Sequence, residues 1–431
     1  MNKIASVRGV APPTVEELVA RARELKPLLS KNGPLGETDR RVIEESIEAA
    51  RKAGFFKICT PKRYGGWEMN TRAMLDVSSA VAEADGGTAW VVNLNNICCW
   101  LASLFPVKAQ DEVFANDPDV RISGVLNPTA TTTKVDGGYR VTGQWHYNSG
   151  GWHSQWAVLG MPIVNEAGEP IDQGLAMFPM ADLEQVDTWF VAGMKSSGSI
   201  SLKANNAFVL NHRVLSVPRA IEGDYPTEMS SQEPFYRSAF IPILSIILVG
   251  PILGLGRAAL DFVRQKANSR TIAYTFFEKQ SASVAFQLQL AEAAMMIDTA
   301  HFHAYRAADD VDSAAARGVY PDMLTRARVR ADTGYVVEKI TQAIDKLLFA
   351  HGSAGFADAS PLQRIWRDAA VASRHAVVLP PVGYELLGKA LLGVENNITP
   401  VLAEYAAVLQ ARRVAEDRMP GHFYLAPASA R

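Results

Sequence analysis

The sequence predicts a mainly α-helical protein with a small β domain in the middle of the chain. Apolar residues recur at helical spacing from residue 14 to about 118, alternate at strand spacing between about 119 and 220, and return to helical spacing from 235 to 418. The 431 residues are 48% hydrophobic and 20% charged, so the chain can bury a large core in two or three domains. We therefore expect an N-terminal helical domain at 1–118, a middle β domain at 119–225, and a C-terminal helical domain with a tail at 226–431.

The first zone begins with a helix cap. In "TVEELVARARELKPLL" a threonine precedes two glutamates, which is typical of a helix N-terminus. "TDRRVIEESIEAARKAGFF" has helical spacing and predicts a second helix that ends at Gly54. "TRAMLDVSSAVAEADGG" and the apolar stretch "GTAWVVNLNNICCWLASLF" predict two further helices, divided by Gly86 and Gly87.

The middle zone has the alternation of β-strands. "GGYRVTGQWHYNSGG" and "QWAVLGMPIV" alternate, "VNEAGEPI" predicts a hairpin turn, and "SISLKANNAFVLNHRVLSVP" predicts two strands with a turn. The last zone returns to long helical segments, which are "GLGRAALDFVRQKANSR", "ASVAFQLQLAEAAMMIDTAHFHAYRAA", "DMLTRARVRADTGYVVEKITQAIDKLLFAHG" and "VLAEYAAVLQARRVAED".

Bulk properties exclude several classes of partner. A net charge of -2 offers no basic surface for nucleic acid. "IPILSIILVGPILGLG" is too short and too broken to span a bilayer, so we expect a buried core helix and no membrane partner. The N-terminus lacks the apolar region of a secretory signal. The three cysteines, Cys59, Cys98 and Cys99, form no disulfide framework, which fits a reducing cytoplasm.

No local motif announces a metal or nucleotide site. "HFH" places its two imidazoles on different faces of a helix, and no HExxH or paired ExxH pattern occurs, so we expect no metal. "GLGRAA" lacks the third glycine and the preceding strand of a dinucleotide fingerprint. Any chemistry must come from scattered side chains or from a bound cofactor.

Two stretches admit both a structural and a functional interpretation. "GYRVTGQWHYNSGG" either runs into an ordinary glycine turn, or presents the aromatic residues Trp145 and Tyr147 and the Ser149 hydroxyl to a flat heteroaromatic ring. "RDAAVASRHAVVLPPVGYE" contains His375, which is either a packed core side chain or an acid–base group.

Taken together, "YRVTGQWHYNSG", "GMKSSGS" and "GSAGFADASPLQRIWRDA" in this order resemble the acyl-CoA dehydrogenase fold, over roughly residues 14 to 415. The resemblance implies an N-terminal helical domain, a middle β-barrel-like domain and a C-terminal four-helix bundle, with flavin between the β domain and the bundle. The family's G-F-x4-P and R-D pattern matches without a gap through Arg367 and Asp368. The tyrosine and catalytic glutamate positions are then His375 and Ala376, and a methyl group cannot abstract a proton.

A histidine at this place is similar to the oxygenase components of two-component flavin-dependent monooxygenases, the branch of p-hydroxyphenylacetate hydroxylase and dibenzothiophene monooxygenase. The resemblance implies that a separate reductase supplies reduced flavin, as FADH2 or FMNH2. It also implies that O2 is the co-substrate and that a C4a-hydroperoxyflavin hydroxylates a small phenol- or indole-like aromatic compound. The alternatives are an acyl-CoA dehydrogenase with bound FAD, taking its base from Asp261, and a catalytically silent scaffold.

The same resemblance assigns residues. His375 and Ser149 match the catalytic positions, and Trp90 and Asn95 join His375 in the substrate pocket. Arg270 matches an arginine that reaches a flavin phosphate across a dimer interface, which implies a homo-oligomer, expected to be a tetramer. Cofactor contacts are expected at Asn127, Thr129, Trp145, Ser149, Gly150, Arg270, Phe276, Phe349 and Gly352. The family's second histidine on the early buried helix has no match here.

Overall fold

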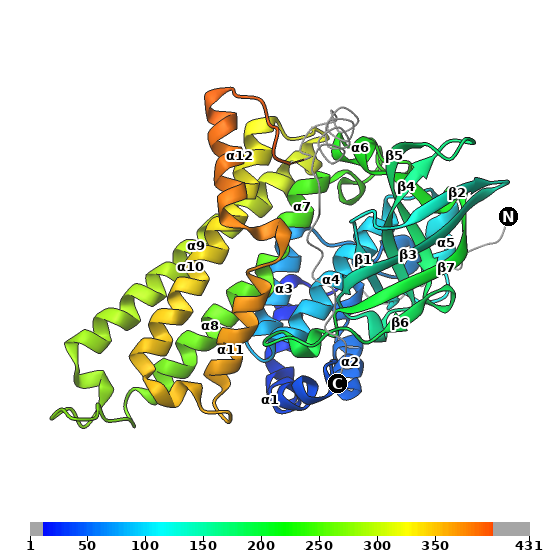
Figure 1. Ribbon diagram of the computed structural model, residues 1–431. Helices are drawn as coiled ribbons and strands as arrows, with labels where there is room; N and C mark the ends of the chain where they lie inside the picture. Colours follow the sequence, from blue (N-terminus) through cyan, green and yellow to red (C-terminus); the bar gives the residue numbers. More distant parts are fainter. Residues whose placement is uncertain (1–11, 400–431) are drawn as a thin grey trace, which may run out of the picture.

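The computed structural model describes residues 12–399 and shows three parts side by side (Figure 1). The N-terminal helices lie between a long helical bundle and a β domain. They are α1 (Val15–Asp39), α2 (Glu44–Lys52), α3 (Thr71–Ala82), α4 (Gly86–Ser103) and α5 (Val107–Phe114). The last predicted helix, "VLAEYAAVLQARRVAED", lies outside the described residues.

The first helix begins at the predicted cap but runs further than predicted. Thr14 accepts a hydrogen bond from the backbone of Glu17, and the Glu17 side chain accepts one from Thr14 in return. The helix then continues to Asp39, so Thr38 lies in its last turn and does not start the second helix. That prediction was wrong because Arg40, at φ 50°, leaves the helical conformation and α2 begins only at Glu44.

The paired glycines that were expected to divide two helices form the first turn of α4. Asp85 caps this helix by accepting a hydrogen bond from the Thr88 backbone at 2.8 Å. Gly87 faces Ser196 so closely that a Cβ would collide with its side chain. The glycine therefore lets the segment around Ser196 lie directly on the start of α4.

The β domain consists of two four-stranded sheets, ordered β1-β4-β5-β8 and β2-β3-β7-β6. All neighbouring strands are antiparallel except β1 and β4. Inward side chains from both sheets, including Val141, Leu159 and Leu202, form a core of their own. The strands are β1 (Ile122–Val125), β2 (Thr131–Val135), β3 (Gly138–Asn148), β4 (Trp156–Val164), β5 (Pro170–Pro179), β6 (Glu184–Val186), β7 (Ile200–Leu210) and β8 (Val214–Ser216).

The predicted hairpin and strand pair are confirmed. β4 and β5 are joined by a turn at residues 165–169, and β7 and β8 by a short 3-10 turn, Asn211–Arg213. The predicted domain boundaries fall between elements, after α5 and after the short helix α6 (Val217–Ile221), and they stay predictions.

The bundle is built on three long helices, α8 (Val249–Lys266), α9 (Val284–Arg317) and α10 (Met323–His351). The shorter α11 (Pro361–Ala372) packs on α8 and α10, and α12 (Pro380–Leu392) packs on α10. α7 (Phe240–Ile246) precedes α8, and the stretch Phe240–Lys266 is long and apolar enough to cross a membrane. However, 83% of its most apolar window is buried inside the protein, which is the pattern of a core helix.

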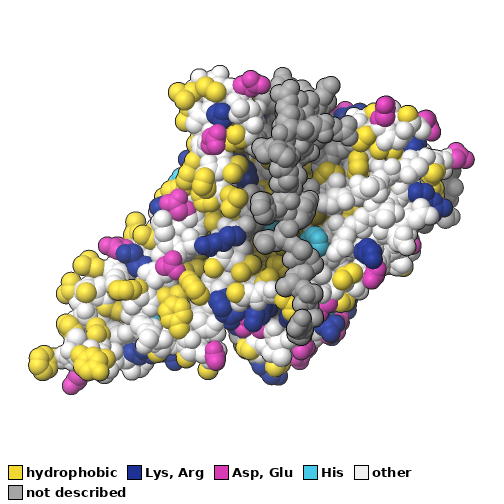
Figure 2. Space-filling view, in the orientation of Figure 1, with side chains coloured by type: hydrophobic (Ala, Val, Ile, Leu, Met, Phe, Trp, Pro, Cys, Tyr) yellow, Lys and Arg dark blue, Asp and Glu magenta, His cyan; other side chains and the backbone are white. Residues whose placement is uncertain are grey.

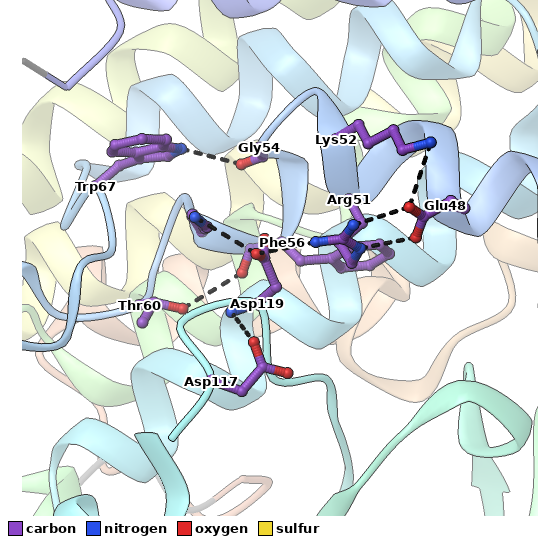
Figure 3. A network of polar contacts seen from close by, with 10 residues as sticks. Glu48, Arg51, Lys52, Gly54, Phe56, Thr60, Trp67, Asp117 and Asp119 are labelled. Atoms are coloured by element: carbon purple, nitrogen blue, oxygen red, sulfur yellow. Dashed lines mark hydrogen bonds and ion pairs between the residues drawn. The ribbon is translucent and has the colours of Figure 1, made fainter. Parts of the chain in front are cut away.

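One hydrophobic core joins the N-terminal helices and the bundle, and it includes residues from the β1-β4-β5-β8 sheet such as Ile122 and Val158. A polar network reinforces the junction with the β domain (Figure 3). The Asp119 carboxylate, just before β1, lies 3.4 Å from Lys57 Nζ and 3.7 Å from Arg51 Nη1. These ion pairs add to the contact between the N-terminal helices and the start of the β domain.

Candidate active site

A line of hydrogen bonds joins α4 to the β domain. Trp90 Nε1 on α4 donates to Ser149 Oγ at 3.0 Å, and Ser149 Oγ lies 2.8 Å from Ser199 Oγ. Ser199 Oγ lies 2.7 Å from Ser197 Oγ. All four side chains are buried. The Ser149 hydroxyl is therefore held in one orientation at the end of β3.

The chain can turn at this point because of Gly150. Its φ of 68° is left-handed, and a Cβ would meet Val91 and the Asn95 amide at 2.9 Å. Its N–H donates to the Ser197 carbonyl at 2.8 Å. Glycine thus brings the end of β3 onto both α4 and the serine segment, and "SG" in the sequence marks this contact.

The serine segment is positioned by the bundle. Met194, at φ 53°, donates its backbone N–H to Asp368 Oδ1 on α11 at 2.6 Å. Asp368 is almost fully buried, and burial, with the negative charge of Asp85 next in importance, raises its pKa to about 7. Asp368 therefore links α11 to the loop that carries Ser197 and Ser199.

His375 lies on the loop between α11 and α12, and the structure brings it to the same place. Its ring centroid is 6.1 Å from that of Trp90, and its Nδ1 accepts a hydrogen bond from the Val377 backbone at 3.2 Å. Nε2 has no partner among the described residues and is not enclosed by protein. The imidazole thus packs on Trp90 and keeps one nitrogen without a partner among the described residues.

The charge on this imidazole is disfavoured. Burial first, and then the positive charge of Arg330, lower the pKa of His375 to about 4. The side chain keeps some accessible surface, so it is half-buried in this single chain. Ala376 follows it and is exposed, so the position of the family's catalytic glutamate holds no acid. At neutral pH the site has a neutral base and no carboxylate base at this step.

Asn95 lies on α4 next to Gly150, and its place in the substrate pocket stays a prediction. It is 1% exposed, and neither its Oδ1 nor its Nδ2 has a hydrogen-bond partner among the described residues. It faces Gly150 rather than His375. Of the three predicted pocket residues, the structure joins Trp90 and His375 by direct ring packing and places Asn95 behind the glycine turn.

Trp145 does not lie where the cofactor prediction placed it. It is fully buried in the core of the β domain, where its Nε1 donates to the Gly160 carbonyl at 2.7 Å. Tyr147, two residues further along β3, is nevertheless 70% exposed. The strand's regular alternation is broken between them, because a β-bulge lies between Trp145 and Asn148 and Tyr147 has a left-handed φ of 68°. Tyr147 packs edge-on against Trp189 at 6.0 Å, and Trp189 was not predicted. These two residues, rather than Trp145, supply the accessible aromatic surface beside Ser149.

The remaining predicted cofactor residues divide into two places. Asn127 and Thr129 are exposed just after β1, where Thr129 Oγ1 donates to the Gln144 carbonyl at 2.7 Å. Arg270 lies after α8, and its Nη2 donates to the His351 carbonyl, next to Gly352, at 3.3 Å. The segment after α8 lies at the far end of the bundle from the β domain (Figure 1). The last two predicted residues, Phe276 and Phe349, are largely exposed.

These residues fit a flavin at both places. Near His375, the buried Ser149 hydroxyl and the accessible Tyr147 offer a polar contact and an aromatic wall to a flat ring. At the far end, the half-buried Arg270 offers a guanidinium whose positive charge suits a flavin phosphate. In the described part of the chain, no group of three or more His, Cys, Asp or Glu residues could hold a metal ion.

Comparison with known proteins identifies the family. Residues 16–115 match the acyl-CoA dehydrogenase N-terminal domain, and residues 246–380 match the acyl-CoA dehydrogenase C-terminal domain. The oxygenase subunit HsaA of a flavin-dependent monooxygenase from Rhodococcus jostii is 31% identical over 381 residues, covering 88% of this chain and all of that protein. The oxygenase component of p-hydroxyphenylacetate 3-hydroxylase from Acinetobacter baumannii is 29% identical, covering 89% of this chain and 91% of its own length.

A solved structure agrees with these relatives. XiaF from a Streptomyces species, crystallised with FADH2 and glycerol, superposes with a TM-score of 0.84 at 36% identity, covering 88% of this chain and 96% of its own. The predicted fold, the two-component oxygenase assignment and the use of reduced flavin with O2 are thereby confirmed, and acyl-CoA oxidation is not favoured. The chain belongs to the acyl-CoA dehydrogenase fold family and, within it, to the oxygenase subunits of flavin-dependent monooxygenases.

Proposed function

We propose that this oxygenase component hydroxylates a small aromatic or heteroaromatic compound beside Trp90, with His375 and Ser149 as its catalytic residues. The observation that carries the proposal is the free Nε2 of a neutral His375, which packs on Trp90 next to Ala376, the residue at the position of the dehydrogenases' catalytic glutamate. The relative named p-hydroxyphenylacetate 3-hydroxylase supports an aromatic substrate.

In this proposal Ser149 and Tyr147 bind the flavin ring, and His375 moves protons. Reduced flavin, when bound, supplies the electrons with which one atom of O2 is inserted and the other is reduced to water. Ser149, oriented by Trp90 and Ser199, would hydrogen-bond the flavin ring, and Tyr147 would cover its face. His375 would accept and return protons at Nε2. The apolar surroundings of Trp90 would keep water away from the reacting oxygen.

The direct test uses oxygen gas labelled with the heavy isotope. The purified chain, a flavin reductase, NADH and flavin are mixed with a panel of phenols and indoles, and the products are analysed by mass spectrometry. One labelled atom in an aromatic product is expected, and only when the reductase or chemically reduced flavin is present. If the chain instead oxidises an acyl-CoA thioester and no labelled oxygen enters the product, it is an acyl-CoA dehydrogenase.

We also propose that the enzyme is a homotetramer in the cytoplasm. Tyr274 and Phe276 on the loop between α8 and α9 are fully exposed in the single chain. Figure 2 shows hydrophobic side chains gathered over this end of the bundle, the end at which Arg270 lies. A second copy would cover this surface and bring Arg270 to the neighbouring flavin. Light scattering at micromolar concentration should give four times the chain mass, and a fully active monomer would contradict the proposal.

A further inference from the structure

A buried arginine stands directly behind the catalytic loop. Arg330 on α10 is 7% exposed, and its Nη2 donates to the carbonyl of Ala376 at 3.3 Å. α10 and the loop touch at Gly334, where a Cβ would collide with Pro380. The guanidinium is therefore fixed next to His375 by the packing of two elements that lie 46 residues apart in the sequence.

This arginine lacks the partner that a buried cation normally has. Arg326, which is also buried on α10, pairs with Glu222 at 3.7 Å. No carboxylate of residues 12–399 lies within ion-pair distance of Arg330, and its Nη1 is enclosed without a hydrogen-bond partner. Burial alone lowers the pKa of Arg330 to about 10, so it remains charged at neutral pH.

An uncompensated charge in a protein interior is costly, because the ion loses its hydration and gains no partner. Here the uncompensated charge lies against the catalytic loop, next to His375. His375, kept neutral, does not add a second positive charge at rest. Within residues 12–399, the positive charge of Arg330 has no carboxylate at ion-pair distance, which suits a ligand that brings its own negative charge.

Building on the proposed function, we propose that Arg330 is a specificity-determining residue that selects phenols and holds them as phenolates. The phenol O–H bond breaks, its electron pair stays on the oxygen facing Arg330, and the proton passes through His375 Nε2 to solvent. The enclosed guanidinium acts through its charge rather than by contact. The phenolate ring is richer in electrons at the carbon ortho to the oxygen. That carbon takes one oxygen atom of O2, with the electrons that reduced flavin supplies, and its C–H bond then breaks. The hydrogen leaves as a proton, and the ring becomes aromatic again. An indole N–H does not ionise near neutral pH. A bound indole therefore brings no negative charge to compensate the positive charge of Arg330.

The probe is 4-nitrophenol, because its phenolate absorbs at a longer wavelength than the neutral phenol. The dye is titrated with pH in the presence of the full-length protein and reduced flavin under argon. We expect the bound dye to ionise about one pH unit or more below the free dye. Arg330→Met should abolish this lowering of the pKa of the bound dye, and it should weaken phenolate binding about tenfold or more. Arg330→Lys, which keeps the positive charge, should retain most of the lowering of the pKa of the bound dye.

The matched control is Arg374→Met, which removes an exposed arginine next to His375 and should leave the titration unchanged. A neutral bound dye in the parent protein overturns the proposal whether or not the variants fold. An Arg330→Met variant that binds 4-nitrophenolate as tightly as the parent also overturns it. So does a variant whose affinity falls only for reduced flavin, or only for 4-nitrobenzoate, an anion that is not a phenolate. If labelled oxygen enters indole but no phenol, the proposed function stands and this inference fails. If the dye ionises as expected but no product is labelled, the proposed function fails instead.

Discussion

His375 is the residue whose surroundings decide its chemistry. Its pKa, lowered to about 4 by burial and by Arg330, lies below its unfolded value near 6.5. Between these values the unfolded chain binds a proton that the folded chain does not, so this side chain costs stability as the pH falls from 6.5 through 4. Above about pH 5 the folded imidazole is neutral and can accept a proton.

This pKa leads to a prediction for the pH profile. The acid limb of product formation, measured as kcat/KM in the free enzyme, should fall near pH 4 to 5 rather than near the ordinary histidine value. The rate of product formation by chromatography at saturating reduced flavin gives the profile. A limb centred close to pH 6.5 would mean that the imidazole is hydrated and that Arg330 does not act on it.

Replacing the imidazole tests its role directly. His375→Asn keeps much of the shape but loses the titratable nitrogen, so product formation should fall by roughly 100-fold or more. Flavin binding should stay near the parent value, and oxygen consumption should continue with hydrogen peroxide as the product. Peroxide and product are quantified in the same reaction. A variant that couples oxygen to hydroxylation as well as the parent does would make His375 a packing residue.

At the scale of elements, α11 positions the site although it ends before His375. Its Asp368 accepts the Met194 N–H and so connects the bundle to the serine segment. The pKa of Asp368, raised to about 7, lies above the unfolded value near 3.8. Between these values the folded chain holds a proton that the unfolded chain lacks, so this group makes the protein less stable as the pH rises from about 4 to 7.

Asp368→Asn should remove this pH dependence while the amide oxygen still accepts the Met194 N–H. The parent should lose up to about 1.4 kcal/mol of unfolding free energy per pH unit relative to the variant in this window. Tm measured from pH 4.5 to 8 for both chains gives the difference, which isolates Asp368 from other titrating groups. Asp358→Asn, an exposed acid before the same helix, is the control. Parallel curves for Asp368→Asn and the parent would show that Asp368 does not titrate in this range.

At the scale of the whole molecule, the residues that fit a flavin lie in two regions that are far apart in the folded chain. Ser149 and Tyr147 are beside the bundle's contact with the β domain, whereas Arg270 lies beyond α8 at the far end (Figure 1). A single chain therefore offers the ring contacts and the phosphate contact at separate places. Association of chains would complete each site, which is why the oligomer belongs to the proposed mechanism.

Arg270→Ala tests the phosphate contact. Loss of a charge-assisted hydrogen bond is worth about 1.5–3 kcal/mol, so the Kd for reduced flavin should rise about tenfold or more. Anaerobic titration followed by fluorescence measures it. Arg264→Ala, an exposed residue of α8 paired with Asp261, should leave the Kd unchanged. Equal flavin affinity in the Arg270 variant and the parent would show that the phosphate is held elsewhere.

Periodicity and capping in the sequence determined the order of helices and strands, the cap at Thr14 and the hairpin at residues 165–169. These features depend on neighbours within a few residues, so local rules suffice. The gap-free spacing through Arg367 and Asp368 also identified His375, because a matching pattern needs no knowledge of the packing. Strand alternation would place Trp145 and Tyr147 on one face, and it could not show the β-bulge that separates a buried Trp145 from an exposed Tyr147.

Only the tertiary structure decided the surroundings of the site. Trp90 meets Ser149, Asp368 meets Met194, and Arg330 lies behind His375 across long sequence separations. Such contacts follow from how α4, α10 and α11 pack against the β domain, and no single segment encodes that packing. The neutral state of His375 has the same origin, because desolvation and a buried charge arise only when distant segments enclose a side chain.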